Sequence, residues 1–253
     1  MWFFNGRDKD IGLALGGGGA KGLAHIGILK VLEEKKYNIK YIAGTSAGSL
    51  IGGLYAYFKD AKKVEGIFLE QDIPSVVKAF SDIGIKQGIV KGDRLKELIE
   101  KYVGNAKIED LDIKFAAVAT DIINAKKVVF RKGKLSDAIV ASCSIPFLFK
   151  PSDINNKILL DGGLVEPVPV KTVKDMGAKK VLAVDLNSGE EAGDSYNTLV
   201  RSFEIMQMQS NKEQLKDIWK VIIPKFNGPV SLLEFTNGED IIKKGEEEAR
   251  KMI

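Results

Sequence analysis

The chain has 253 residues, 45% of them hydrophobic and 28% charged, which is enough to bury the core of one large domain or two small ones. The net charge of +4 and the absence of aromatic residues interleaved with the basic ones argue against nucleic-acid binding, while permitting a weak attraction to an anionic membrane surface. The single cysteine, Cys143, excludes an internal disulfide. We expect a cytoplasmic protein, since the N-terminal MWFFNGRDKD also lacks the apolar stretch of a secretory signal.

Along the chain, short apolar runs alternate with helical patterns. Several runs are apolar throughout, which favours strands buried on both faces of a parallel sheet. We expect strands at residues 11–15, 41–43, 115–119, 128–130, 158–160, 181–184 and 221–223, and helices at 22–36, 46–58, 93–103, 135–141, 199–216 and 240–252. This alternation predicts an α/β layer fold with a mainly parallel sheet, whose functional groups follow the C-terminal strand ends. With no repeat or linker visible, we expect one domain over residues 1–253.

Residues 41–58 need a separate test, because they carry no charge and reach the length of a membrane-spanning helix. They contain four glycines, two serines and one threonine, mostly toward their beginning. We therefore expect a strand, a turn and a helix here instead of a membrane span.

Four consecutive glycines, residues 16–19, follow the first expected strand and precede a helix. Glycine loses more backbone entropy on folding than any other residue, so four together indicate a loop whose amides face something negatively charged. This is not a Walker loop, because Gly22 follows Lys21 where Ser or Thr is required. The dinucleotide-binding pattern G-x-G-x-x-G is met, but the second strand ends in IAGT without the acidic residue of such sites.

Residues 44–48, GTSAG, fit the pattern G-x-S-x-G between an expected strand and a helix of small residues. This is the setting of a nucleophile elbow, in which Gly44 and Gly48 allow a turn sharp enough to hold Ser46 in a strained backbone with its hydroxyl exposed. We therefore predict that Ser46 is a nucleophile. The glycine loop would then supply N–H donors to the oxyanion that acyl transfer creates.

A serine nucleophile needs a base, and the only histidine, His25, is expected to pack on an apolar helix instead. Three aspartates end expected strands, and in a parallel sheet they would share the edge that carries Ser46. Asp161 ranks first because the two glycines after it allow close approach to another backbone. Asp121 ranks second, and Asp185 is the third candidate. The alternative role of all three is to cap the turn or helix that follows.

The motifs GGGGAKG, GTSAG and DGG occur in this order and resemble those of the patatin-like phospholipase family, serine acyl hydrolases with a Ser-Asp dyad. The stretches AHIGILKVLEE, ATD, ASCSIPFLFKP and GLVEPVPV add to the resemblance, which covers about residues 10–190 and leaves a helical region at 195–253. It implies a three-layer α/β/α fold with a mainly parallel central sheet. Two departures are the second glycine of DGG, where many members have alanine, and Cys143, where a small residue is usual.

Carried over by position, the resemblance implies that Ser46 is the nucleophile and that Asp161 takes its proton without a histidine. Lys21 stands in the place of the family's basic residue. The implied oxyanion donors are Gly17, Gly18 and Gly19, and the glycines that support the motifs are Gly22, Gly44, Gly48, Gly162 and Gly163. No metal or other cofactor is implied.

The implied substrate is a lipid or another fatty-acyl ester, met during transient contact with a membrane surface. Residues 64–90 are a candidate lid or acyl-chain pocket, and residues 199–235 a candidate contact with a lipid interface or a second subunit; ordinary core packing is the alternative for both. Cys143 is expected to be buried and not to be a nucleophile. Thioesterase or acyltransferase activity on the same dyad, or an idle lipid-binding module, are the alternative functions.

Overall fold

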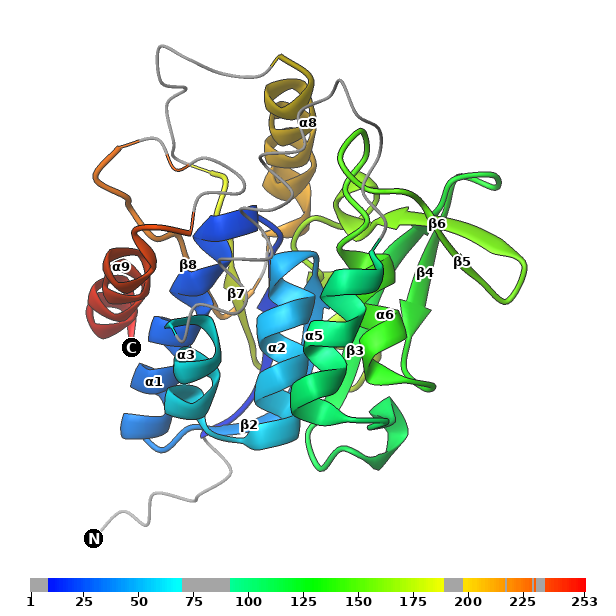
Figure 1. Cartoon of the computed structure of the whole chain (residues 1–253). Coiled ribbons are helices and arrows are strands. Elements are labelled where there is room, and N and C mark those ends of the chain that lie inside the picture. Colours follow the sequence, from blue (N-terminus) through cyan, green and yellow to red (C-terminus); the bar gives the residue numbers. More distant parts are fainter. Residues whose placement is uncertain (1–8, 70–91, 189–197, 217, 229, 231–234) are drawn as a thin grey trace, which may run out of the picture.

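The computed structural model describes residues 9–69, 92–188, 198–216, 218–228, 230 and 235–253, and at its centre lies an eight-stranded sheet (Figure 1). The strands follow the order β5-β6-β3-β2-β1-β7-β8, and β4 pairs with β3 beside this path. Their bounds are β1 Asp10–Leu15, β2 Asn38–Thr45, β3 Lys114–Asp121, β4 Lys126–Phe130, β5 Ser152–Ile154, β6 Lys157–Asp161, β7 Val181–Val184 and β8 Lys220–Ile222.

The sheet is mostly parallel, as predicted. Strands β3, β2, β1, β7 and β8 run in one direction, whereas β4 and β6 pair with β3 in the antiparallel sense and β5 pairs with β6 likewise. Strand β5 was not expected from the sequence. It forms a hairpin with β6 through Asn155 and Asn156, which both have positive φ angles, of 53° and 59°. Two left-handed residues in a row are the signature of a tight hairpin turn, which reverses the direction of β6.

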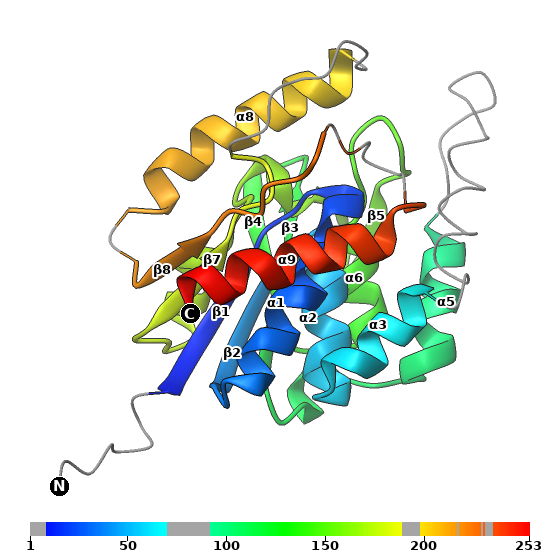
Figure 2. The ribbon, with the colours of Figure 1, turned by 90° about the vertical axis from the view of Figure 1, so that its left-hand side faces the viewer.

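Helices cover both faces of the sheet, which confirms the α/β layer fold. Their bounds are α1 Ala24–Glu34, α2 Ala47–Phe58, α3 Ala61–Leu69, α5 Asp93–Val103, α6 Leu135–Ser142, α7 Val170–Asp175, α8 Thr198–Gln214 and α9 Gly238–Met252. Helices α1, α2, α3, α5, α6 and α9 share the larger core, while α7 packs on the opposite face. Helix α8 lies across the end of the sheet at which the parallel strands finish (Figure 2).

Strand β1 is almost wholly apolar because its side chains alternate between two buried faces of the sheet. Leu13 and Leu15 of β1 face the larger core, whereas Ala14 between them faces α7. Ala43 of β2 and Ala183 of β7 lie on the same side as Ala14. Because these small residues line the second face, α7 can lie close to the sheet and leave both faces of β1 buried.

The expectations for two segments, the helical region at 195–253 and the candidate lid at 64–90, can be compared with the structure in part. The region 195–253 is not only helical, because it also contributes β8 to the sheet edge. Of the candidate lid at residues 64–90, residues 70–90 lie outside the described residues, while the segment before them belongs to α3, where Val64, Ile67 and Phe68 are buried in the core. Among the described residues, no helix is both long and apolar enough to cross a membrane.

Candidate active site

Ser46 lies at the sharp turn between β2 and α2, the position that the G-x-S-x-G pattern predicts. Its backbone angles are φ 52° and ψ −125°, a conformation that a non-glycine residue adopts only at a cost of about 1–3 kcal/mol. The turn is also crowded: a Cβ atom on Gly48 would lie 2.0 Å from the carbonyl oxygen of Leu15, and one on Gly44 would lie 2.4 Å from that of Gly48. Both flanking positions therefore require glycine.

A serine outside the motif holds this turn in place. The amide of Ser46 donates to Oγ of Ser142 at 2.9 Å, and the Ser142 hydroxyl donates to the carbonyl oxygen of Val118 at 2.6 Å. From within α2, the Ser49 hydroxyl donates to the Ser46 carbonyl oxygen at 2.7 Å. These bonds connect the strained residue to β3 and to its own helix. Ser142 was missed by the sequence analysis, because nothing in the run ASCS distinguishes it from a packing residue.

Asp161 ends β6 and faces the same pocket as Ser46. The expectation that its strand runs parallel to the one before Ser46 is wrong, since β6 is antiparallel to β3. The two residues nevertheless meet, because Val118 of β3 pairs with Thr45, and Ala119, one residue further on, pairs with Asp161. The last residue of the antiparallel strand β6 therefore lies next to the end of β2.

The carboxyl group of Asp161 is buried, with a residue exposure of 1%. Burial raises its pKa from 3.8 to about 6, against the opposing effects of the nearby Ser46 hydroxyl and of the Gly163 amide, which donates to Oδ1 at 2.7 Å. Oδ2 makes no hydrogen bond of good geometry with any described residue. Catalytic contacts are often long before substrate binds, so the missing hydrogen bond does not exclude Asp161 as a general base.

The other two candidate aspartates have the capping role that was their alternative. Asp121 accepts hydrogen bonds from the amides of Ile123 and Asn124 and from the Asn124 side chain, which lowers its pKa and closes the β3–β4 turn. Asp185 accepts from the amide of Asn187 at 3.0 Å and from the side chain of Asn211 at 3.1 Å. Neither lines the pocket that contains Ser46.

His25 is fully buried in α1 and acts on the glycine loop. Its Nε2 donates to the carbonyl oxygen of Gly16 at 2.8 Å, and burial lowers its pKa to about 4, so the ring is neutral at pH 7. Nδ1 has no partner among the described residues. The ring does not line the pocket that holds Ser46 and Asp161. His25 is therefore a positioning residue, as the sequence analysis expected of a histidine on an apolar helix.

This role predicts different outcomes for two replacements of His25. Glutamine can still donate to Gly16, so His25→Gln should keep kcat within about fivefold, whereas His25→Ala should lower kcat about 10- to 100-fold and the free energy of unfolding by about 2 kcal/mol. Ester hydrolysis and urea unfolding measure both quantities. Equal inactivation by glutamine and alanine would instead assign His25 as the base.

Two amides of the glycine loop have no hydrogen-bond acceptor among the described residues. The Gly17 amide donates to the Pro167 carbonyl oxygen at 3.1 Å, so it is already used within the fold. The amides of Gly18 and Gly19 have no acceptor among the described residues, and both glycines line the pocket with Ser46. This narrows the predicted oxyanion donors to Gly18 and Gly19, next to the N-terminus of α2, whose dipole also favours negative charge.

Lys21 supports the loop without lining the pocket that holds Asp161, whereas Gly22 lines a second, apolar pocket that also contains Ser46. The Lys21 side chain is buried, and its Nζ lies 3.1 Å from Oδ1 of Asn187 and 3.7 Å from the Glu204 carboxylate of α8. Asn187 in turn donates to Gln207 of α8 at 2.8 Å. This chain of polar contacts fixes α8 over the pocket. No sequence motif marks Gln207, and Asn187 carried only the weak signal of following a strand end.

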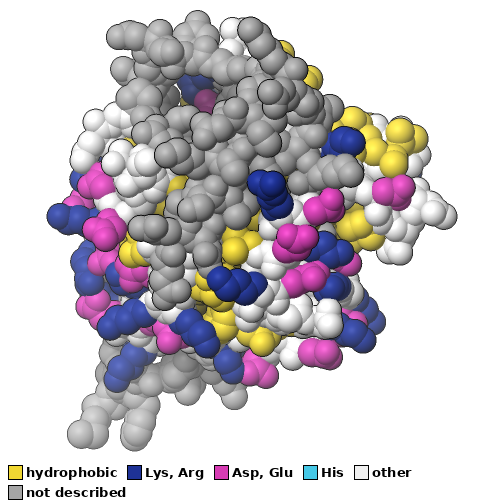
Figure 3. Space-filling model, in the orientation of Figure 1, with side chains coloured by type: hydrophobic (Ala, Val, Ile, Leu, Met, Phe, Trp, Pro, Cys, Tyr) yellow, Lys and Arg dark blue, Asp and Glu magenta, His cyan; other side chains and the backbone are white. Residues whose placement is uncertain are grey.

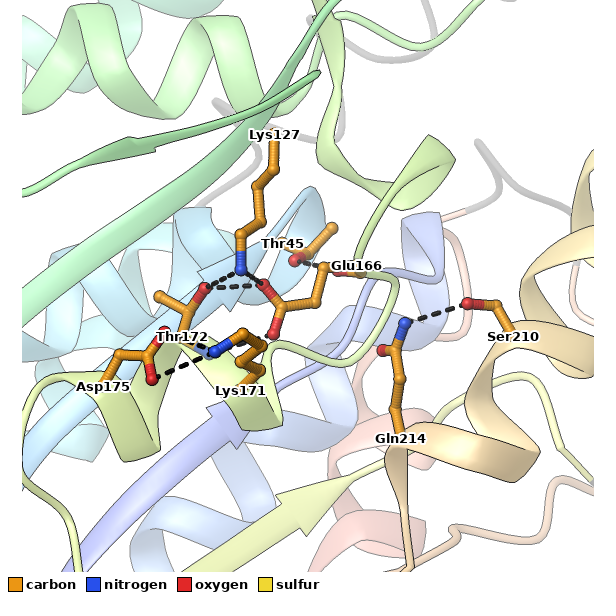
Figure 4. A network of polar contacts seen from close by, with 8 residues as sticks. All are labelled: Thr45, Lys127, Glu166, Lys171, Thr172, Asp175, Ser210 and Gln214. Carbon is orange, nitrogen blue, oxygen red and sulfur yellow. Dashed lines mark hydrogen bonds and ion pairs between the residues drawn. The ribbon is translucent and has the colours of Figure 1, made fainter. Parts of the chain in front are cut away.

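A second buried network holds the segment after Asp161 (Figure 4). Glu166 accepts from Lys127 at 2.8 Å and from the amide of Thr172 at 2.9 Å, while its carbonyl oxygen accepts from the Thr45 hydroxyl at 2.8 Å. Gly162 fits tightly here, since a Cβ atom would lie 2.2 Å from the Val118 carbonyl oxygen. The residue before the nucleophile is thus tied to the segment that follows the candidate base.

Two hollows meet at Ser46. The narrow polar one is lined by Ser46, Asp161, the loop glycines and residues of α8. The second is almost wholly apolar and also contains Ser46; its lining includes Leu23, Leu50, Ile51, Phe68, Leu95, Cys143, Ile145 and Phe149. Burial raises the pKa of the Cys143 thiol, so this cysteine is a lining residue, not a thiolate nucleophile. The described residues contain no cluster of three or more metal-ligating side chains.

Comparison with known proteins finds a matching family model and similar sequences. A family model described as patatin-like phospholipase matches residues 13–174. An uncharacterized NTE family protein of Mycobacterium tuberculosis is 37% identical over 190 residues, which are 72% of this chain and 50% of that protein. Lysophospholipase NTE1 of Yarrowia lipolytica is 37% identical over 186 residues, 70% of this chain and 13% of that protein. The chain spans about half the length of the first of these relatives.

Solved structures show the same fold at low sequence identity. VipD from Legionella pneumophila superposes with a TM-score of 0.58 and 14% identity, covering 95% of this chain and 66% of its own. The type III effector protein ExoU superposes with a TM-score of 0.53 and 15% identity, covering 96% of this chain and 52% of its own. At this sequence identity, both structures show only that the fold is shared.

Proposed function

Because the chain belongs to the patatin-like phospholipase family, we propose that it is a serine hydrolase that cleaves the carboxyl esters of phospholipids or lysophospholipids. The observation that carries the proposal is the pairing of Ser46, strained at the end of β2, with the buried carboxyl group of Asp161 in one pocket. Asp161 takes the hydroxyl proton directly as Ser46 attacks the ester carbonyl, and it returns this proton to the leaving alcohol when the ester C–O bond breaks. Water, activated by the same carboxylate, then hydrolyses the acyl-enzyme.

The pKa of Asp161 supports its role as base. An ordinary aspartate, with a pKa near 4, is a weak base toward a hydroxyl group. Burial raises the pKa of Asp161 to about 6, which brings the carboxylate nearer to the working pH while leaving it ionised at neutral pH. The amides of Gly18 and Gly19 stabilise the oxyanion. The negative charge that faces the glycine loop is therefore that of the oxyanion, which exists only during the reaction.

The apolar hollow supports a fatty-acyl substrate. It begins at Ser46 and is lined by side chains of α2, α3, α5 and the loop after α6, with almost no polar surface. A chain bound there brings its carbonyl carbon to the Ser46 hydroxyl, and the leaving alcohol then faces the polar hollow under α8. We propose that the protein acts in the cytoplasm and meets its lipid at a membrane surface.

The experiment that tests the proposal is labelling with a fluorophosphonate probe, followed by mass spectrometry of the adduct. We expect labelling at Ser46, none in Ser46→Ala, and a rate about 100-fold or more lower in Asp161→Asn. Ser202→Ala is the matched control, because Ser202 is an exposed serine of α8 whose hydroxyl bonds only to the Thr198 carbonyl oxygen. It should label as the wild type does.

A panel of substrates separates the proposed activity from its alternatives. Lysophospholipids and diacyl phospholipids should be hydrolysed faster than acyl thioesters, and added alcohols should not capture the acyl group in preference to water. Folded wild-type protein that binds lipid without being labelled at Ser46 would identify an idle lipid-binding module instead.

A further inference from the structure

Large hydrophobic side chains are exposed mainly at one end of the molecule. Seven of the ten large apolar residues that are exposed in the described part of the chain belong to segments at the end of the sheet that carries Ser46. These seven, which we call the apolar rim, are Ile122, Ile123, Phe147, Leu164, Leu199, Ile205 and Met206. Figure 3 shows apolar side chains gathered at the upper right of this end, over the β3–β4 turn. Single exposed apolar residues are ordinary, but a gathering around one site indicates a contact surface.

The rim residues follow closely on residues of the candidate active site in the sequence, or belong to the helix that lines it. Ile122 and Ile123 form the β3–β4 turn directly after Asp121, and Leu164 follows Asp161 by three residues. Phe147 lies between α6 and β5, two residues after Ile145, which lines both hollows. The other three belong to α8, whose Glu204 and Gln207 line the polar hollow. In Figure 1, α8 lies at the top of the molecule, and the turn between β3 and β4 lies lower, at the upper right.

The most prominent members are held outward by the backbone. Ile123 is 74% exposed at a turn closed by the Asp121 side chain. Phe147 is 67% exposed and has a φ angle of 69°, a region that bulky residues rarely adopt. A strained phenylalanine whose ring points into water has no explanation in packing, because the ring buries little of itself. Its position fits insertion into something apolar outside the protein.

Among the described residues, the exposed charges beside Ile123 and Phe147 are mainly positive. Lys126 follows Ile123 by three residues, Lys150 follows Phe147 by three, and Lys157 lies close enough to Asp121 to lower the pKa of that carboxyl; all three lysines are exposed. Asp153 of β5 is the exposed carboxylate in the same region. Apolar tips flanked by lysines match the chemistry of an anionic lipid surface, where the tips enter the interface and the lysines meet headgroup charge.

We propose that the apolar rim docks the protein on anionic phospholipid bilayers, with the mouth of the active site against the lipid. The inference rests on the proposed function, because docking in this orientation lets a lipid reach Ser46 without crossing water. Apolar side chains that project from separate segments suit a fluid lipid interface, which adapts to their spacing.

Vesicle co-sedimentation tests the proposal, with all variants made in a Ser46→Ala background so that no lipid is consumed. On vesicles of phosphatidylcholine and phosphatidylglycerol, Ile123→Ser combined with Phe147→Ser should weaken binding about tenfold or more. Tyr57→Ser is the matched control, since Tyr57 is 39% exposed at the end of α2 and away from the rim, and it should bind like its parent. Vesicles of phosphatidylcholine alone should bind more weakly.

The same substitutions in the protein with Ser46 intact separate docking from chemistry. Hydrolysis of a soluble short-chain ester should stay within about twofold of wild type, because neither Ile123 nor Phe147 lines either hollow. Rim-dependent vesicle binding without ester hydrolysis would preserve docking and reject the hydrolase. Equal vesicle binding by the double variant and Tyr57→Ser would overturn docking. Docking would also be overturned if the double variant changed its oligomeric state in light scattering but not its vesicle binding.

Discussion

Replacing Ser46 by alanine should lower kcat for ester hydrolysis about 10⁴-fold or more, while substrate binding stays nearly unchanged. The reason is that no acyl-enzyme can form without the hydroxyl, although the Asp161 carboxylate and the glycine-loop amides remain in place. Single-turnover hydrolysis of a lipid ester measures the rate, and binding of a non-hydrolysable ether lipid measures affinity. Ser202→Ala controls for changes in surface serines. Retention of more than about a hundredth of the wild-type rate would place the nucleophile elsewhere.

The backbone at Ser46 adds a second expected result. Alanine retains the strain of the φ angle of 52°, whereas glycine adopts such angles without a Cβ penalty. Ser46→Gly should therefore be more stable than Ser46→Ala by about 1 kcal/mol, after the higher chain entropy of glycine in the unfolded state is counted. Equal stability of the two inactive variants would mean that the turn relaxes when the hydroxyl is absent.

The parts of the site that the sequence predicted are those with a local backbone requirement. Gly44 and Gly48 are needed because neighbouring atoms leave no room for a Cβ, and Gly162 is needed for the same reason after Asp161. Such requirements appear as short motifs in the chain. The preference for Asp161 over Asp121 rested on the glycines after Asp161. In the structure, Asp121 instead accepts hydrogen bonds from amides of the turn that follows it.

The parts that the sequence could not predict depend on side chains brought together from distant segments. Ser142 meets the Ser46 amide across 96 residues, and Gln207 meets Asn187 from a helix whose sequence shows only amphipathic spacing. No local pattern encodes such pairs. The reversed direction of β6 is different, because the pair Asn155 and Asn156 is a recognisable hairpin signal that strand periodicity alone does not include.

Replacing Asp161 by asparagine should reduce kcat/KM about 10³-fold or more and at the same time stabilise the protein at pH 7. Wild-type kcat/KM should rise with pH to a plateau, with an apparent pKa of about 6 that belongs to Asp161, since the pKa of His25 lies near 4. The gain in stability follows because the folded state holds the Asp161 proton more tightly than the unfolded chain does. As pH rises from about 4 to about 6, Asp161 ionises in the unfolded chain while the folded protein still holds the proton, so the free energy of unfolding of wild type falls by about 3 kcal/mol.

The pH dependence of this gain identifies its source. Asparagine carries no charge, so Asp161→Asn should exceed wild type by about 3 kcal/mol in the free energy of unfolding above pH 6, and the difference should vanish near pH 4. His25 acts in the opposite sense: burial lowers its pKa from 6.5 to about 4, so it makes the folded state less stable as pH falls through that window. In wild type the two effects oppose each other, and in the variant only the histidine's remains. Urea unfolding of both proteins across this range should therefore show the variant losing stability more steeply on acidification; a constant difference between the two would indicate packing, not a buried charge, as the origin of the gain.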